Sequence, residues 1–400
     1  MRPFIIAAAL LLPTIVTAQP QDDPSTVGRA KHLYEVLFTK PARLSLESIA
    51  PGSGIPVGVG LKPKPWRSAS VFKIVEGRAS ISQHKYWAVD GSVAFQGVDP
   101  NRPEWRVEPY ARFRNMKRLN YYGLGNDTLE TERTTFAMLD RRTGAYGYIR
   151  PVGWIALGAR GEGFWPRTNS GEDPDVPSVE DRFPQDQRSG FGDDTNYAYI
   201  GGFINVNYPY SRSEPPRRGG DYMVSLGTYQ DVSDTDHSFR RFEVEGRERF
   251  PVFGVDRVLT IHGRLSSSTA STGHSVPFYL MDTLGGADNL RGFKESIIGG
   301  DEATSTLRSF ESFRFRDLST ALIQLDFRQR LWSQIFATFF IDAGVVASTV
   351  DALSLGDMHH GVGLGLSVYR TNALAFRIEF GIWGGEGRPH YLTSGRGLQF

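Results

Sequence analysis

Two stretches decide the fold of this chain: Leu284-Gly285-Gly286-Ala287-Asp288-Asn289-Leu290-Arg291-Gly292-Phe293 and Phe340-Ile341-Asp342-Ala343-Gly344. The first is polar and rich in glycine, which is typical of a loop, and it carries one cation, Arg291. The second lies in an apolar, β-branched and aromatic run that is typical of a strand, and it carries one anion, Asp342. Burying either charge alone would cost free energy. The two stretches therefore suggest that Arg291 on the loop pairs with Asp342 on the strand, the alternative being an exposed loop arginine and an unrelated aspartate.

Both stretches resemble motifs of a known family. Leu290-Arg291-Gly292-Phe293 is similar to the lid-loop motif of the BamA/TamA-like outer-membrane assembly barrels, the bacterial surface antigen family. The segment Phe340-Ile341-Asp342-Ala343-Gly344 resembles the strand motif against which that loop docks, and residues 121–127, 314–317 and 325–328 are similar to further family stretches. The resemblance covers residues 52–400 and implies an all-β fold. That fold is a transmembrane antiparallel β-barrel of about sixteen strands, with a long lid loop entering the lumen.

Composition excludes several classes of protein. The chain has 400 residues and a net charge of +1, so it has no global field to attract nucleic acid. It contains no cysteine, which excludes a disulfide framework and a thiolate metal site. Aromatic residues make up 12% and there are 44 glycines, as expected for a β protein with aromatic girdles and tight turns.

The N-terminus has the pattern of a secretory signal. Arg2 is followed by an apolar core at residues 5–16, and Val16-Thr17-Ala18 is a small-residue cleavage site, so residues 1–18 are predicted to be removed. An uncleaved N-terminal anchor is the alternative. Residues 19–51 form a short polar lead, predicted to be periplasmic, before a barrel at 52–400. This lead is too short for the polypeptide-transport-associated modules of the larger family members.

Alternation with a period of two predicts the strands. Residues 106–114 place polar side chains on one face and apolar ones on the other, and residues 87–95, 239–250 and 321–329 alternate in the same way. Apolar to lipid and polar to lumen is the pattern of a transmembrane barrel. A soluble sandwich has the same alternation with the faces reversed, so the periodicity leaves both open. The usual strand lengths give roughly twelve to sixteen strands.

Two long segments interrupt the strands. Residues 166–196 are acidic and contain few aliphatic side chains, which predicts a surface loop that is dispensable for folding. Residues 266–307 contain the lid motif. Long loops at one end and short turns at the other are typical of outer-membrane barrels. We expect the barrel to close through its first and last strands, and the terminal Phe400 resembles an assembly signal of such barrels.

Other polar residues predict support for the lid rather than catalysis. Arg314, Arg316 and Asp317 are expected to extend the lid network in the lumen, the alternative being strand-end charges in water. The pair at 359–360 is the only adjacent pair of histidines and is expected in a loop near Asp351 and Asp357, but adjacent strand residues point to opposite faces, which disfavours a metal site. No metal or other cofactor and no catalytic residue are predicted.

The resemblance implies insertion or translocation of proteins or lipids in a bacterial outer membrane. The expected partners are outer-membrane lipids and nascent outer-membrane or secreted proteins, and nucleic acid is not expected. One alternative is a passive pore or structural barrel plugged by the lid, and a sealed lumen would argue against the pore. A second alternative is an outer-membrane enzyme, which as a class carries a Ser–His pair on the lipid face.

Overall fold

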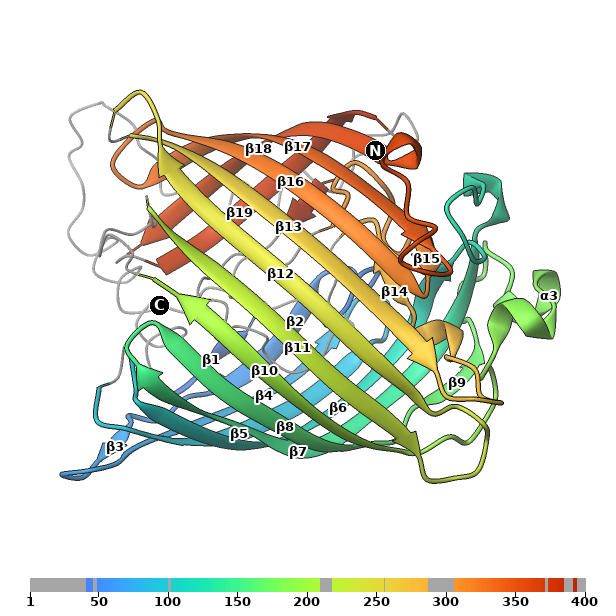
Figure 1. The fold of residues 1–400 in the computed structure, drawn as a ribbon, viewed down its shortest axis with the longest axis horizontal. Helices are drawn as coiled ribbons and strands as arrows, with labels where there is room; N and C mark the ends of the chain where they lie inside the picture. The colour runs from blue at the N-terminus through green and yellow to red at the C-terminus, as the bar shows by residue number, and fades with distance from the viewer. Residues whose placement is uncertain are drawn as a thin grey trace, which may run out of the picture.

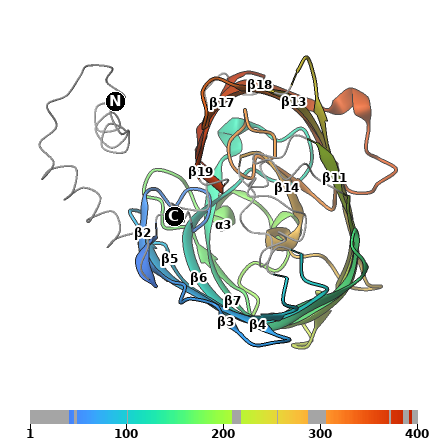
Figure 2. The same ribbon diagram turned by 90° about the vertical axis from the view of Figure 1, so that its left-hand side faces the viewer.

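The computed structural model describes residues 41–45, 49–99, 102–208, 218–254, 256–286, 306–370, 373–384 and 391–393. In this part of the chain, one sheet of 18 strands curves into a barrel (Figures 1 and 2). A second sheet pairs β14 (Asp282–Leu284) with β15 (Phe315–Asp317), and Figure 2 shows β14 inside the ring. The predicted all-β class is confirmed.

Most strands pair with the strand before and the strand after them in the chain, always antiparallel. These strands, with their bounds, are β1 (Ala42–Ser45), β2 (Pro56–Leu61), β4 (Phe72–Ser82), β5 (Trp87–Gln96), β6 (Trp105–Tyr121), β7 (Thr134–Val152), β8 (Ile155–Phe164), β10 (Tyr197–Asn207), β11 (Gly219–Asp231), β12 (Phe239–Pro251), β13 (Arg257–Ala270), β16 (Ser319–Arg330), β17 (Ile335–Ala347), β18 (His359–Arg370), β19 (Ala373–Trp383) and β20 (Tyr391–Thr393). Two short strands are additions: β3 (Trp66–Arg67) pairs with β4, and β9 (Arg167–Ser170) pairs with β7.

The first and last described strands can be compared with the predicted start and end of the barrel, residues 52 and 400. Strand β1 pairs with β2 and lies within the predicted lead, so the sheet begins before residue 52. Closure through the last residues, including Phe400, falls outside the described part of the chain. The exact strand number and the closing pair therefore stay predictions. The helices in the described part of the chain are too short and too polar to span a bilayer.

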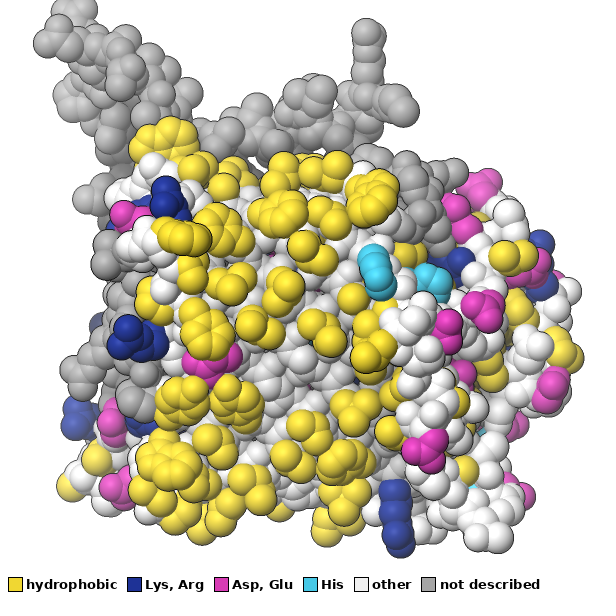
Figure 3. All heavy atoms as spheres, turned by 45° about the horizontal axis from the view of Figure 1, so that its top comes forward, with side chains coloured by type: hydrophobic (Ala, Val, Ile, Leu, Met, Phe, Trp, Pro, Cys, Tyr) yellow, Lys and Arg dark blue, Asp and Glu magenta, His cyan; other side chains and the backbone are white. Residues whose placement is uncertain are grey.

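Side-chain burial decides between the barrel and the sandwich. In β6, the apolar Val107 and Phe113 are exposed by 47% and 43%, whereas Glu108 and Arg114 are buried. Strand β16 repeats the pattern, with Ile323 exposed and Gln324 buried. Figure 3 shows hydrophobic side chains spread over the outer surface of the strands. Polar groups inside and apolar groups outside suit a lipid bilayer, so the transmembrane-barrel prediction is confirmed and the sandwich is excluded.

Loop lengths differ between the two ends of the barrel. Strands β7 and β8 are separated by residues 153–154 and β16 and β17 by residues 331–334, and both turns lie at one end. The opposite end carries the loops after β6, β8, β13 and β17, which contain η1 (Glu130–Glu132), α3 (Val179–Arg182), η2 (Gln185–Arg188), η3 (Phe278–Leu280) and η4 (Leu355–Asp357). Figure 1 places α3, β9, β14 and β15 at this loop end.

The segment 166–196 is packed more firmly than its composition predicts. It contains β9, α3 and η2, and it buries Val179 and Phe183 in a cluster of rings at the loop end. Ser178 and Asp181 form a capping box at the start of α3. The expectation of a loop with little to bury was wrong, because its few apolar side chains face the cluster. Whether the barrel folds without this segment stays a prediction, and the burial of Val179 and Phe183 argues against it.

Phe183→Ala is expected to loosen this segment. The Phe183 ring lies 4.9 Å from the Tyr121 ring, edge to face, and it also covers Gly123. Truncating a buried Phe costs roughly 3–5 kcal/mol, so limited proteolysis should cut residues 166–196 at least tenfold faster than in the parent protein. Leu355→Ala, in a loop position that is 76% exposed, is the control. Equal cleavage rates in all three proteins would contradict the packing role.

Candidate functional site: a docked lid segment

The site begins where the long loop after β13 returns to the barrel wall. Gly285 and Gly286 have positive φ angles of 112° and 63°, which glycine adopts without strain. Gly285 N donates to Thr306 Oγ1 at 2.9 Å, and Thr306 N donates to the Gly286 carbonyl at 2.9 Å. These bonds join the two sides of the loop at the point where residues 306–310 begin. We call residues 306–310 the lid segment.

Apolar packing holds the lid segment against the wall. Leu307 and Phe310 are buried in a cluster with Leu284 and Phe315 of the small sheet. Leu322 of β16 and Val346 of β17 complete the cluster. The segment therefore lies inside the barrel and bridges the small sheet and the main wall.

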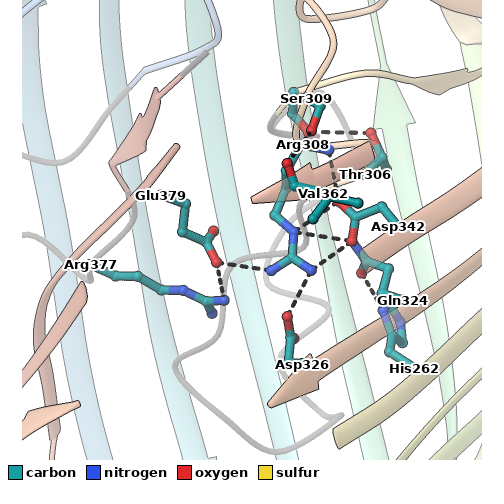
Figure 4. Close-up of polar contacts among 11 residues, drawn as sticks. His262, Thr306, Arg308, Ser309, Gln324, Asp326, Asp342, Val362, Arg377 and Glu379 are labelled. Atoms are coloured by element: carbon teal, nitrogen blue, oxygen red, sulfur yellow. Dashed lines mark hydrogen bonds and ion pairs between the residues drawn. The ribbon is translucent and has the colours of Figure 1, made fainter. Parts of the chain in front are cut away.

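Arg308 is the polar centre of the site. Its backbone N–H donates to Asp342 Oδ2 at 2.8 Å, and its guanidinium donates to both carboxylate oxygens of Asp342, with Nη2 at 2.6 Å from Oδ1 (Figure 4). The guanidinium also contacts Glu379 at 2.9 Å and Asp326 at 2.7 Å. It lies over the ring of Phe340, with the guanidinium carbon 3.8 Å from the ring centroid. The planar guanidinium, with its several N–H donors, can bind these three carboxylates at the same time.

The surrounding groups extend the network over five strands, β12, β13, β16, β17 and β19. Gln324 donates to Asp342 Oδ1 at 3.2 Å, and His262 lies between Gln324 and Glu245, at 2.7 Å from each. Arg377 pairs with Glu379. Asp342, Glu379 and Arg308 are each at most 3% exposed. The buried carboxylate of Asp342 therefore depends on Arg308 for a compensating charge, whereas Glu379 shares Arg308 with Arg377.

Glycines of the wall admit the lid segment. A Cβ at Gly361 of β18 would lie 2.6 Å from Ser309 Oγ and 2.8 Å from Ser309 Cβ. A Cβ at Gly381 of β19 would lie 2.6 Å from Ser309 Cα, and one at Gly344 of β17 would lie 2.9 Å from Leu284 Cδ1. Any other residue at these positions would meet the segment or the small sheet beside it. Close backbone approach thus explains the glycines.

The predicted strand motif is part of this site. Phe340, Asp342 and Gly344 share the inward face of β17, and all three contact the lid segment or its neighbours. The predicted loop motif, Leu290, Arg291, Gly292 and Phe293, lies outside the described residues. The pairing of Arg291 with Asp342 thus stays a prediction, and in the described part of the chain Arg308 binds Asp342.

Sequence analysis missed Arg308, although the sequence carries a signal for it. Leu307-Arg308-Ser309-Phe310 repeats the order Leu, Arg, small residue, Phe of residues 290–293 within the same loop. Residues 290–293 drew the prediction because their Gly-Phe pair matches the family motif. A comparison of the loop with itself would have identified both arginines as candidates.

Arg314 and Arg316 anchor the loop at a different place from Arg308. Arg314 donates to Thr128 Oγ1 at 2.7 Å and to the Thr128 carbonyl at 2.5 Å, in the loop between β6 and β7. Arg316 donates to the Phe278 carbonyl at 2.5 Å and faces the rings of the loop-end cluster. Both are at most 5% exposed, so the alternative of charges in water is wrong. Asp317 accepts the Leu318 N–H at 2.8 Å in the small sheet.

The loop between β6 and β7 closes over the small sheet. Gly125 N donates to the Arg316 carbonyl at 2.8 Å, and Asn126 Nδ2 donates to the Asp357 carbonyl at 2.8 Å. His359 Nε2 lies 2.9 Å from the Asn126 carbonyl, and its ring stacks on Phe315 with centroids 3.9 Å apart. His359 therefore begins β18 rather than lying in a loop. No metal-binding group of His, Cys, Asp or Glu occurs among the described residues.

The fold and the site define a class: an antiparallel barrel with an apolar outer wall, in which a loop folds inward and is held by a buried guanidinium. Solved structures share this fold. BamA of Haemophilus ducreyi lacking POTRA domains 1–3 aligns with a TM-score of 0.54 at 11% identity, over 93% of this chain and 78% of that one. CdiB of Escherichia coli aligns with a TM-score of 0.53 at 13% identity, over 88% and 62%. CdiB of Acinetobacter baumannii has 10% identity and a TM-score of 0.49, over 88% and 59%.

Comparison with family models gives no match. Comparison with curated proteins gives none either. At these identities BamA and the Escherichia coli CdiB establish the fold, and the function is argued from the site.

Proposed function

We propose that this protein is a bacterial outer-membrane barrel that inserts or translocates proteins, with nascent outer-membrane or secreted proteins as its clients. The observation that carries the proposal is the docking of the lid segment through Arg308 on Asp342, Asp326 and Glu379. A barrel needs no such network merely to span a bilayer. The network fixes a loop to β16, β17 and β19, near the end of the described sheet. A wall that can move at this place would serve the insertion or translocation of a client protein. The BamA fold similarity supports the same function.

The passive pore is less well supported. Within the described residues, the lid segment lies inside the barrel, and the loop end is filled by buried rings that include Tyr121, Phe136 and Phe278. Ring pairs such as Phe136–Phe278 pack edge to face at 4.8 Å between centroids. A permanently open channel would keep this region wet and polar. Passage would therefore require these groups to move.

Lipids are proposed as the membrane that surrounds the barrel and as a second class of transported molecule. The proposed insertion or translocation is not a catalytic reaction and uses no metal or other cofactor. The apolar side chains on the outer faces of the strands support membrane residence. The signal sequence predicted for residues 1–18 and the short turns at one end support the orientation of an outer-membrane barrel, with the loop end outside.

Crosslinking in cells tests the proposal. A photoreactive residue is placed at Val59 on β2 or at Phe380 on β19, both on the outer face near the ends of the sheet. Ile261, on the outer face of β13, is the matched control. Newly made outer-membrane or secreted proteins should crosslink at the first two positions and at least tenfold less at Ile261. No client crosslinks at either position, together with steady ion conductance in planar bilayers, would favour the pore instead.

A further inference from the structure

We propose that Ser275, His237 and Asp193 form a hydrolytic site at the loop end, separate from the lid, that cleaves small polar carboxylic esters. His237 Nε2 lies 2.9 Å from Asp193 Oδ2, and His237 Nδ1 lies 3.1 Å from Ser275 Oγ. The three residues come from the loops after β8, β11 and β13. A nucleophile, a base and an orienting carboxylate within hydrogen-bond reach are what acyl transfer requires.

The contacts of His237 allow the useful tautomer: Nδ1 lies 3.1 Å from Ser275 Oγ and 3.3 Å from the Ser275 carbonyl, so it accepts from the hydroxyl when it is unprotonated and donates to the carbonyl when it is protonated. A carboxylate only accepts, so the contact with Asp193 places a proton on Nε2. The neutral ring then presents the lone pair of Nδ1 to the hydroxyl of Ser275, as a general base must. His237 is 5% exposed, and its backbone N–H donates to Asp231 Oδ2 at 3.2 Å. Asp231 also accepts the N–H groups of Ser233 and Thr235, which fixes the turn that carries the imidazole.

A cavity of about 480 Å³ opens beside the three side chains, all of which line it. Its wall also includes Ser189, whose Oγ lies 2.7 Å from Ser275 Oγ. Gly190 lines the wall as well, and a Cβ there would lie 2.8 Å from Pro277 Cβ. The lining residues are polar or glycine, with no long aliphatic side chain among them, so the cavity suits a small ester rather than an acyl chain.

His274 adds an N–H donor to the wall of the cavity. Its Nδ1 accepts the Ser238 N–H at 3.2 Å, so the neutral ring carries its proton on Nε2. His274 lines the same cavity next to Ser275 in the chain. An N–H donor near the nucleophile would stabilise the oxyanion of a tetrahedral intermediate.

The reaction balances without a further reactant besides water. Ser275 Oγ bonds to the carbonyl carbon of the ester while its proton passes to His237 Nδ1. The carbon–oxygen bond to the alcohol breaks, and the leaving oxygen takes that proton. Water then gives a proton to His237 as its oxygen bonds to the acyl carbon, and the bond to Ser275 Oγ breaks as that oxygen regains the proton. The products are a carboxylic acid and an alcohol, and Asp193 takes part only by holding His237 Nε2.

This inference departs from the prediction that the chain has no catalytic residue. The predicted enzyme alternative required Ser and His on the lipid face, whereas this group lies among the loops. Its members are spread over residues 193–275 with no local motif. Only the folding of three loops brings them together.

Active-site labelling of the purified full-length barrel in detergent tests the proposal. A fluorophosphonate probe should label Ser275, located by mass spectrometry, and the protein should hydrolyse p-nitrophenyl acetate. Ser275→Ala should abolish both signals, and His237→Gln should lower turnover at least about 100-fold. Asp193→Asn should lower turnover with little change in KM, because Asp193 acts through His237.

Ser271→Ala, an exposed serine in the same loop, is the matched control and should behave as the parent protein. Heat-modifiable mobility on a gel confirms that each variant is a folded barrel. The proposal is overturned if the folded parent protein is not labelled at Ser275 and hydrolyses the ester no faster than Ser275→Ala. It is also overturned if Ser271→Ala loses as much activity as Ser275→Ala.

Discussion

Arg308→Ala is expected to release the lid segment and to destabilise the barrel by roughly 3–5 kcal/mol, the usual cost of removing one partner from a buried ion pair. Arg308 is 3% exposed and is the shared cation of Asp342, Asp326 and Glu379. Its loss removes the guanidinium from the buried carboxylate of Asp342, while Glu379 keeps its contact with Arg377. Heat-modifiability should show unfolding at a lower temperature, and protease should cut the loop between β14 and β15 faster. Arg257→Ala, an exposed strand-end arginine bonded to Gln329, is the control and should change neither result.

A double-mutant cycle separates pairing from independent effects. If Arg308 and Asp342 act as a pair, Arg308→Ala with Asp342→Ala should be little worse than either single change. The same cycle with Arg291 tests the pairing predicted from the sequence. Plain addition of the two single effects in the Arg308 cycle would refute the pair seen in the structure. Strong coupling only in the Arg291 cycle would instead favour the sequence-based pair.

Much of the barrel could be predicted from alternation alone, because each strand has one wet and one apolar surface. The 106–114 strand shows this directly, since Glu108 and Arg114 face inward and Val107 and Phe113 outward. Periodicity could not say which face was inside, because a sandwich reverses the faces without changing the pattern. Burial settles the question. The inward face of β17 was likewise predictable from the spacing of Phe340, Asp342 and Gly344.

The partner of Asp342 was not predictable in the same way. A strand has a period that fixes which side chains share a face, whereas a loop has none, so the choice between Arg291 and Arg308 depends on the path of the backbone. The packing of residues 166–196 was missed for a related reason. Composition gives the number of apolar residues in a segment but not their positions in the fold. Val179 and Phe183 are few, yet both are buried in the ring cluster and hold the segment there.

Gly361→Ala is expected to push the lid segment off the wall, at a cost of about 1–3 kcal/mol for an overpacked contact. The new Cβ would lie 2.6 Å from Ser309 Oγ and 2.8 Å from Ser309 Cβ, and its next contact, Ser309 N, is 3.6 Å away. Protease cutting near the lid segment should rise. Gly161→Ala, in β8, is the control, because a Cβ there meets nothing within 4 Å.

Ser309→Gly provides a rescue that follows from these distances. It removes both atoms that the new Cβ of Gly361→Ala would meet, so Gly361→Ala with Ser309→Gly should recover the protease resistance of Ser309→Gly alone. Gly381→Ala should not be rescued, since its Cβ would lie 2.6 Å from Ser309 Cα, an atom that glycine keeps. Ser309→Gly itself loses only the hydrogen bond from Oγ to the Val362 carbonyl at 3.3 Å. The two positions differ in the Ser309 atoms that they would meet: side-chain atoms at Gly361, and the Cα atom at Gly381. Equal rescue of both variants, or of neither, would therefore show that the segment does not rest on these glycines.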